Sequence, residues 1–183
     1  AVTIPNGTDC VRFAPSGELR GQVRQELGLA EDAFVLGCLA RWAVMKGHPV
    51  LLDALAVLRQ RGLSPHLLLA GTGTEPANAQ LRALIAAAGI GAHSTCLGER
   101  RDVARLMPAL DALVLPSIHG EAFPMVLGEA MACELPCVAT DVGDSAHLLG
   151  EGGLIVPAGD TQALAAALER LMRMPKQARL AMG

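Results

Sequence analysis

The chain has 183 residues, of which 51% are hydrophobic and 18% are charged, and its formal net charge is -3. This balance favours a folded domain with a buried core, and the absence of a basic block argues against general nucleic-acid binding. No apolar run reaches the roughly 18 residues that a membrane-spanning helix needs.

Apolar segments alternate with helical patterns along the whole chain. Residues 1–15 are punctuated by Pro and Gly and are predicted to form a loop. We expect strands at 33–40, 66–70, 95–97, 112–115, 136–139 and 154–156. We expect helices at 19–27, from 48 or 49 to 61, at 77–88, at 103–110 after a cap at Asp102, at 125–133, and through 172 after a cap at Asp160 or Thr161, with a helical turn at 146–149.

The strands are short and apolar on both faces, which is typical of a parallel sheet covered by helices on both sides. Right-handed crossovers make the doubly wound order 3-2-1-4-5-6 the first choice. The sequence therefore predicts an α/β, Rossmann-like domain with a six-stranded parallel sheet. This domain would span residues 1–183, with a linker and the first helix in residues 1–30.

The cysteines are odd in number and scattered over predicted core segments, which disfavours a disulfide framework or a metal site. We interpret them as reduced structural thiols, and such thiols indicate a cytoplasmic protein. The five positions are Cys10, Cys38, Cys96, Cys133 and Cys137.

Polar and glycine residues lie in the loops that follow the predicted strands. Arg41 and Lys46 follow the first strand, Gly71 and Gly73 the second, and Arg100 the third. Because parallel strands all end at one edge of the sheet, we expect these residues to gather where open α/β sheets bind ligands. The alternatives are surface cations, a plain glycine turn and a solvated arginine.

Two carboxylates flank the start of the helix predicted at 125–133. Glu121 lies in the preceding loop, and Glu129 lies about one and a half turns into the helix. This helix is apolar nearly all round, so a carboxylate within it is costly unless it meets a hydrogen-bond donor. Glu129 could instead form a buried ion pair, and Glu121 could be a solvated acid or a cap. Gly128 weakens the helix by roughly 1 kcal/mol and would permit close packing.

A ligand with a diphosphate between two groups of hydroxyls suits this set of residues. Cations, a glycine loop and helix N-termini favour phosphate, whereas carboxylates must meet neutral hydroxyls. A nucleotide-sugar satisfies both requirements. His119 could touch the substrate or be a plain loop histidine, His48 is expected to begin a helix, and Asp141 and Asp144 are expected to be turn and cap residues.

Several motifs together cover essentially the whole chain. They are Ile4–Asp9 (IPNGTD) with Phe13–Pro15, Arg41 with Lys46–Gly47, Leu69–Gly73 (LAGTG), Leu97–Gly98, the pair Glu121 and Glu129, Glu134–Thr140 (ELPCVAT) and Gly153–Pro157 (GLIVP). With these motifs the chain resembles the C-terminal, donor-binding domain of a GT-B glycosyltransferase of family 4, the group 1 retaining glycosyltransferases.

The resemblance implies transfer of a sugar from a UDP-, GDP- or ADP-sugar with retention of configuration, without a metal or other cofactor. Arg41 and Lys46 would hold the diphosphate, Glu121 would contact the donor sugar, and Glu129 would bind the ribose diol. The remaining donor-site residues implied by the resemblance are Gly71, Gly73, Leu97, Arg100, Ala122, Phe123, Pro124, Met125 and Val126.

The resemblance also implies a sugar, lipid-linked or small-molecule acceptor on an N-terminal domain that is absent from these residues. The isolated domain is expected to turn over little. A role in cell-envelope polysaccharide synthesis would place the longer protein in the cytoplasm, with peripheral attachment to the inner face of the membrane as an open alternative. Ala122 and Glu134 stand where the family commonly has Gly, and the usual Glu after the fifth strand is missing.

Three other functions remain to be compared. An NAD-dependent oxidoreductase is disfavoured, because Gly71-Thr72-Gly73 lacks a third glycine and follows the second strand rather than the first. A GT-B-like sugar-nucleotide epimerase and a non-catalytic nucleotide-sugar module would share the proposed donor site.

Overall fold

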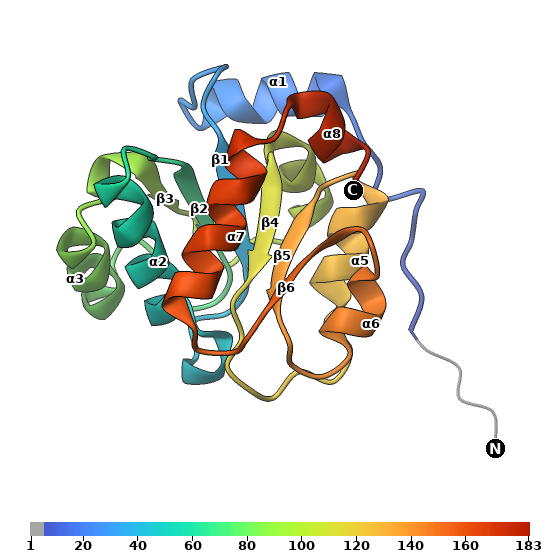
Figure 1. Ribbon diagram of the computed structural model, residues 1–183. Helices are drawn as coiled ribbons and strands as arrows, with labels where there is room; N and C mark the ends of the chain where they lie inside the picture. The colour runs from blue at the N-terminus through green and yellow to red at the C-terminus, as the bar shows by residue number, and fades with distance from the viewer. Residues whose placement is uncertain (1–5) are drawn as a thin grey trace.

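The computed structural model describes residues 6–183 and contains one six-stranded sheet with the order β3-β2-β1-β4-β5-β6 (Figure 1). Every neighbouring pair of strands is parallel, so the predicted fold class and strand order are confirmed. Ile4 and Pro5, which belong to the first motif, lie outside the described residues together with the start of the predicted N-terminal loop.

The strands are β1 (Val35–Leu39), β2 (His66–Ala70), β3 (Ser94–Cys96), β4 (Ala112–Leu115), β5 (Cys137–Thr140) and β6 (Gly153–Val156). The helices are α1 (Gly17–Glu26), α2 (His48–Gln60), α3 (Ala79–Ala87), α4 (Val103–Leu106), α5 (Met125–Ala132), α6 (Ser145–Leu149), α7 (Thr161–Arg173) and α8 (Lys176–Leu180). Short 3-10 helices cover Val44–Lys46, Gly91–His93 and Met107–Ala109.

Most predicted elements are present within a few residues, but one predicted helix is divided and one observed helix was not predicted. The helix predicted at 103–110 is divided into α4 and the 3-10 helix Met107–Ala109. Pro108 explains the break, because proline lacks the N–H that would continue the α-helical ladder. The short helix α8 was not predicted, and none of its residues is buried, so it carries no amphipathic pattern.

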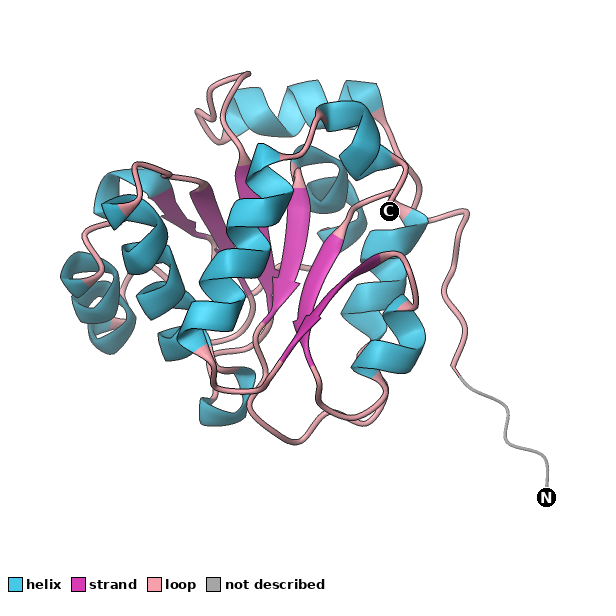
Figure 2. Cartoon of the chain, in the orientation of Figure 1, coloured by secondary structure: helices cyan, strands magenta, loops and turns pink. Residues whose placement is uncertain are grey.

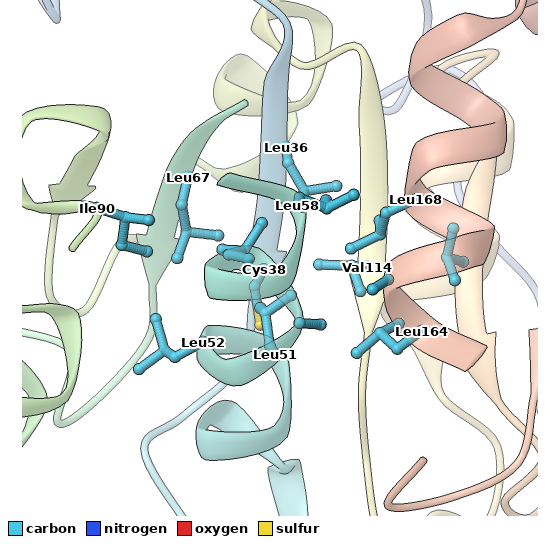
Figure 3. Close-up of a cluster of buried hydrophobic side chains, with 14 of the residues drawn as sticks. Leu36, Cys38, Leu51, Leu52, Leu58, Leu67, Ile90, Val114, Leu164 and Leu168 are labelled. Atoms are coloured by element: carbon cyan, nitrogen blue, oxygen red, sulfur yellow. The ribbon is translucent and has the colours of Figure 1, made fainter. Parts of the chain in front are cut away.

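Helices cover both faces of the sheet (Figure 2). Successive side chains of a strand point to opposite faces, and Leu36 and Cys38 of β1 therefore join one buried cluster while Val35 joins the other. Leucines of α2 and α7 complete the first cluster (Figure 3). None of the helices in residues 6–183 combines the length and the hydropathy of a transmembrane span.

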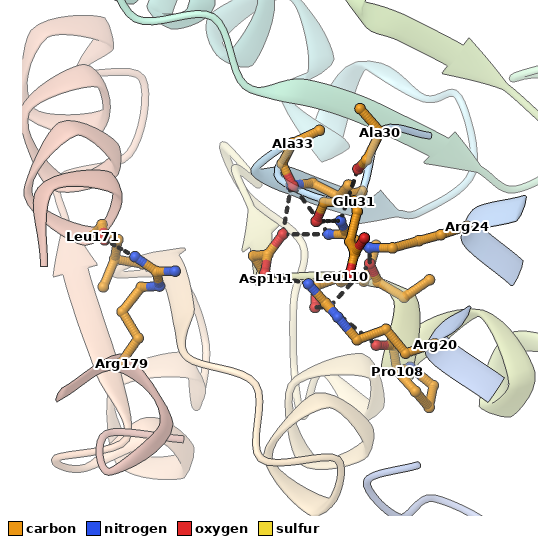
Figure 4. A network of polar contacts seen from close by, with 12 residues as sticks. Arg20, Arg24, Ala30, Glu31, Ala33, Pro108, Leu110, Asp111, Leu171 and Arg179 are labelled. Atoms are coloured by element: carbon orange, nitrogen blue, oxygen red, sulfur yellow. Dashed lines mark hydrogen bonds and ion pairs between the residues drawn. The ribbon is translucent and has the colours of Figure 1, made fainter. Parts of the chain in front are cut away.

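A charge network ties α1 to the sheet edge at which the strands begin (Figure 4). The Arg24 side chain, whose residue is only 4% exposed, donates from Nη2 to Asp111 Oδ2 at 2.6 Å. Arg20 Nη2 donates to Asp111 Oδ1 at 2.7 Å, and the Val35 N–H donates to Oδ2 at 2.8 Å. Burial lowers the pKa of Arg24, and the Asp111 carboxylate opposes that shift.

Glu134 ends α5 in a left-handed conformation, with φ of 57°, and no other non-glycine residue between 6 and 183 has a positive φ. The Leu135 N–H donates to the Ala130 carbonyl, which closes the helix as glycine-ended helices are closed. The sequence departure at position 134 therefore falls where a glycine would adopt the backbone without strain.

Candidate donor-binding site

The strands end toward the bottom of Figure 2. Residues from the loops at this edge line a cleft of about 350 Å³. It is formed by the loops after β1, β2 and β3 and by the first turns of α5. Its lining residues are Leu39, Ala40, Arg41, Ala70, Gly71, Thr72, Glu99, Arg100, Val103, Met125, Val126 and Glu129. Six of the predicted site residues are among them: Arg41, Gly71, Arg100, Met125, Val126 and Glu129.

The helix that carries Glu129 is less buried than the sequence predicts. Only Leu127 and Ala130 of α5 are fully buried, and Met125 is 37% exposed. The half-buried Glu129 therefore sits on a face that opens to the cleft rather than inside a packed core.

The carboxylate of Glu129 takes part in none of the ion pairs among residues 6–183. Burial raises its pKa, and the nearby charge of Arg12 opposes that shift. The alternative of a buried ion pair is thus wrong. A partly desolvated acid without a partner is a group that gains from a hydroxyl ligand.

Glu121 is held by two donors on one oxygen. Lys46 Nζ and Ser117 Oγ each lie 2.5 Å from Glu121 Oε1. The side chain of Glu121 is 8% exposed and that of Lys46 is 17% exposed. Glu121 is therefore neither a solvated loop acid nor a helix cap, and Lys46 is not a free surface cation. Neither residue lines the cleft itself.

Arg41 stays exposed at the cleft, where its Nη2 lies 3.4 Å from Met45 Sδ. The loop that carries Arg41 and Lys46 is fixed from two sides. The Trp42 N–H donates to the Thr72 carbonyl at 2.7 Å, and the Ile118 N–H donates to the Met45 carbonyl at 2.8 Å. The cationic loop after β1 is thus tied to the loops after β2 and β4.

Gly47 allows the loop to lie against β4. Its φ is 65°, and a Cβ atom at this position would lie 1.9 Å from the Pro116 carbonyl oxygen. Only glycine fits such a close approach in this conformation. The same contact holds Lys46 beside the segment that carries Ser117 and Glu121.

Gly128 provides a second close approach. A Cβ atom there would lie 2.5 Å from Thr8 Oγ1, so the hydroxyl of Thr8 occupies the space that a side chain would need. The predicted close packing at Gly128 is confirmed. This contact brings the segment that carries Arg12 onto α5.

Arg100 reaches the cleft while its guanidinium is held by Asp102, with Nε–Oδ1 and Nη2–Oδ2 distances of 2.7 and 2.6 Å. Asp102 and Asp144 stand at the N-cap positions of α4 and α6, but neither side chain makes a capping hydrogen bond. Both residues thus occupy the predicted cap positions without making the side-chain bond, unlike Asp160 at the start of α7, whose side chain accepts from the Ala163 N–H. In the case of Asp102, the carboxylate binds Arg100 instead.

The other predicted donor-site residues do not line the cleft. They are Gly73, Leu97, Ala122, Phe123 and Pro124. Leu97 packs against the hydrophobic clusters, and Pro124 is buried at the start of α5. The Ala122 carbonyl accepts from the Asp144 N–H at 2.9 Å, which ties the loop before α5 to the loop after β5.

His48 is a buried residue whose environment the sequence did not reveal. It is 1% exposed, and within the described residues both ring nitrogens lack a hydrogen-bond partner. Its ring centroid lies 5.0 Å from that of Trp42. Burial lowers the pKa of His48 to about 4, with the Ala40 carbonyl opposing the shift. The sequence shows only a helix start here, because no apolar pattern marks the ring as buried.

We expect His48 to make the fold less stable in mild acid. The unfolded chain takes up a proton near pH 6.5, whereas the folded ring stays neutral until about pH 4. Stability should therefore fall by up to about 3 kcal/mol as the pH drops through this window. Urea denaturation of the wild type and of His48→Phe at pH 7 and pH 5 would measure the effect.

His48→Phe should lose less stability between these pH values than the wild type does. His147→Phe is the matched control, because His147 is exposed. Equal losses in the wild type and in His48→Phe would show that the buried ring is not the titrating group.

The cysteines are free thiols, and burial raises the pKa of Cys38 and of Cys137 to about 12. Such thiols stay protonated and unreactive at neutral pH. Within residues 6–183, no three His, Cys, Asp or Glu side chains are grouped closely enough to hold a metal ion.

Residues 33–174 match the family model described as Glycosyl transferases group 1. The chain belongs to the group 1 glycosyltransferases. Phosphatidyl-myo-inositol mannosyltransferase of Mycobacterium leprae (strain TN) is 38% identical over 177 residues, which cover 94% of this chain and 44% of that protein. This group 1 chain thus spans less than half the length of that curated relative.

Solved structures of glycosyltransferases share the fold of this group 1 chain. The crystal structure of Anabaena Alr3699/HepE in complex with UDP and glucose is 30% identical, with a TM-score of 0.84 and coverage of 97% of this chain and 48% of that chain. Sucrose-phosphate synthase from Thermosynechococcus elongatus is 29% identical, with a TM-score of 0.83 and coverage of 98% and 45%. The predicted family and its GT-B architecture are confirmed.

Proposed function

We propose that this chain is the donor-binding half of a retaining, metal-independent glycosyltransferase that takes its sugar from a nucleotide-sugar. One observation carries the proposal: the carboxylate of Glu129, which has no ion-pair partner among residues 6–183, lines the same cleft as the exposed residue Arg41. A carboxylate and a cation facing one cavity suit a ligand that has both hydroxyls and phosphates.

The diphosphate would lie near Arg41 and the first turn of α5. No side chain in the described part of the chain caps this helix, so the backbone N–H groups of Met125 and Val126 remain available to phosphate or sugar oxygens. Glu129 lies further along the same helix and would accept hydrogen bonds from the ribose diol. Arg100, fixed by Asp102, would border the base.

Lys46 and Glu121 would act at the bond that breaks. As the nucleoside diphosphate leaves, negative charge grows on its phosphate oxygens, and an ammonium group placed there stabilises that charge more than it stabilises the ground state. Glu121 would hold hydroxyls of the donor sugar next to this bond. Together with Arg41, Lys46 would supply the electrostatic stabilisation that other enzymes obtain from a metal ion.

The related Anabaena protein has been crystallised with UDP-glucose, which supports a nucleotide-sugar as the donor and makes UDP-glucose the first to test. The acceptor, a sugar, a lipid-linked sugar or a small molecule, would bind mainly to a second domain. We propose a cytoplasmic location and a role in cell-envelope polysaccharide synthesis, with peripheral membrane attachment as the alternative. This chain alone would turn over little.

Glu129→Gln is expected to weaken nucleotide binding by about tenfold or more, because hydrogen bonds to a charged acceptor are the stronger ones. Isothermal titration of the wild type and the variant with UDP and with UDP-, GDP- and ADP-sugars would measure the loss. NAD, the ligand of the competing dehydrogenase function, should not bind.

Glu18→Gln is the matched control, because Glu18 is exposed on α1, away from the cleft. It should bind as the wild type does. If Glu129→Gln binds the wild-type protein's preferred nucleotide with unchanged affinity, the cleft is not the binding site of the sugar donor.

A further inference from the structure

Ser117 lies at the end of β4 and was not among the predicted site residues. It is fully buried, and its hydroxyl donates to Glu121 Oε1 at 2.5 Å. Its own carbonyl accepts a hydrogen bond of 2.5 Å from Thr140 Oγ1, at the end of β5. The hydroxyl is therefore fixed by two neighbouring strands of the sheet.

The other donor to Glu121 is built differently. Lys46 belongs to the loop after β1, and its ammonium group ends a long, flexible side chain that remains 17% exposed. Under the proposed function this ammonium group has a second task, because it must reach the diphosphate. A single ammonium group that moves toward a phosphate gives up part of its contact with the carboxylate.

We propose that Ser117 is a positioning residue that keeps Glu121 in place when Lys46 engages the diphosphate. The side chain of Glu121 is only 8% exposed. Without the Ser117 hydroxyl, its carboxylate would have no fixed hydrogen-bond donor once Lys46 turns to the bound nucleotide-sugar. A buried carboxylate without a donor is costly, so it would rotate toward solvent and away from the sugar. This inference rests on the proposed function, in which Glu121 contacts the donor sugar.

The backbone around Glu121 is held in the same way. The Asp144 N–H donates to the Ala122 carbonyl, and a Cβ atom at Gly143 would lie 2.2 Å from the Glu121 carbonyl oxygen. The loop after β5 thus fixes the main chain while Ser117 fixes the side chain. Neither the Ser117 hydroxyl nor the loop after β5 depends on Lys46. Glu121 can therefore keep its position beside the sugar while the Lys46 side chain moves to the diphosphate.

Affinities for a nucleotide with and without its sugar test this role. In Ser117→Ala, the affinity for the nucleotide-sugar that binds the wild type should fall about tenfold, because one hydrogen bond to a charged group is lost. The affinity for the matching nucleoside diphosphate should stay within about twofold, because Lys46 and Arg41 remain. Lys46→Ala should instead weaken both ligands, because the nucleoside diphosphate and the nucleotide-sugar each carry the diphosphate that Lys46 would bind.

Thr95→Val is the matched control, because the hydroxyl of Thr95 also makes a hydrogen bond inside the protein, 2.8 Å from His66 Nε2, and Thr95 lies on β3, outside the segments that hold Glu121. It should leave the ratio of the two affinities unchanged. Ser117→Cys, with a weaker donor of similar shape, should lie between the wild type and Ser117→Ala, and it replaces the alanine variant if that variant does not fold.

The outcomes separate this inference from the function on which it rests. If Ser117→Ala weakens the diphosphate and the nucleotide-sugar equally, or weakens neither, Ser117 does not position Glu121, while the donor site stands. If the wild type binds no nucleotide at all, the proposed function fails and this inference fails with it.

Discussion

Asp111→Ala is expected to lower the free energy of unfolding by about 3 to 5 kcal/mol, because it leaves a buried cation without its partner. The carboxylate accepts from Arg20, Arg24 and the Val35 N–H, and Arg24 is almost fully buried. Removal of the carboxylate would therefore loosen α1 from both central strands at once. Urea denaturation of the two proteins at pH 7 would measure the difference.

Glu169→Ala is the matched control, since Glu169 pairs with Arg61 and Arg173 at the surface. Exposed pairs of this kind contribute little to stability. An effect of Asp111→Ala no larger than that of Glu169→Ala would mean that the network is solvated in solution and does not fasten α1.

Lys46→Ala is expected to reduce the rate of sugar transfer by about 100- to 1,000-fold, the usual loss when one group that stabilises transition-state charge is removed. The effect has two sources under the proposed function. The leaving diphosphate loses a cation, and Glu121 loses one of its two donors. The measurement is the transfer rate at saturating donor in the protein that also carries the acceptor-binding domain.

Lys176 is the only other lysine of the chain, and it is exposed at the far end of the sheet. Lys176→Ala should therefore transfer sugar at the wild-type rate. A loss of less than about tenfold in Lys46→Ala would show that this ammonium group does not stabilise the departing phosphates.

The strand order and most element positions follow from the sequence, because short apolar runs alternate with amphipathic segments throughout. The positions of Arg41 and Glu129 at one cleft also follow, because loops after parallel strands share an edge. The contact between Lys46 and Glu121 does not follow in the same way. The residues lie 75 positions apart, and topology brings their loops together without fixing which side chains meet.

Long-range polar contacts explain the other omissions. Arg24 and Asp111 are 87 residues apart, and nothing in either local pattern marks them as partners. His48 sits beside a proline at a helix start, a position that sequence patterns assign to the surface as readily as to the core. Ser117 follows Pro116 at the end of a strand, where a small polar residue indicates only a turn.

The Trp42 ring, which packs against His48, can report on its surroundings by fluorescence. Trp42 is the only tryptophan, and the chain contains no tyrosine. Near-ultraviolet emission from this domain therefore comes from one indole, placed in the loop between Arg41 and Lys46 and 5.0 Å from the histidine ring. An unlabelled sample thus carries its own optical probe of the cationic loop, and both proton uptake by the imidazole and arrival of a ligand can be followed as changes in that single signal.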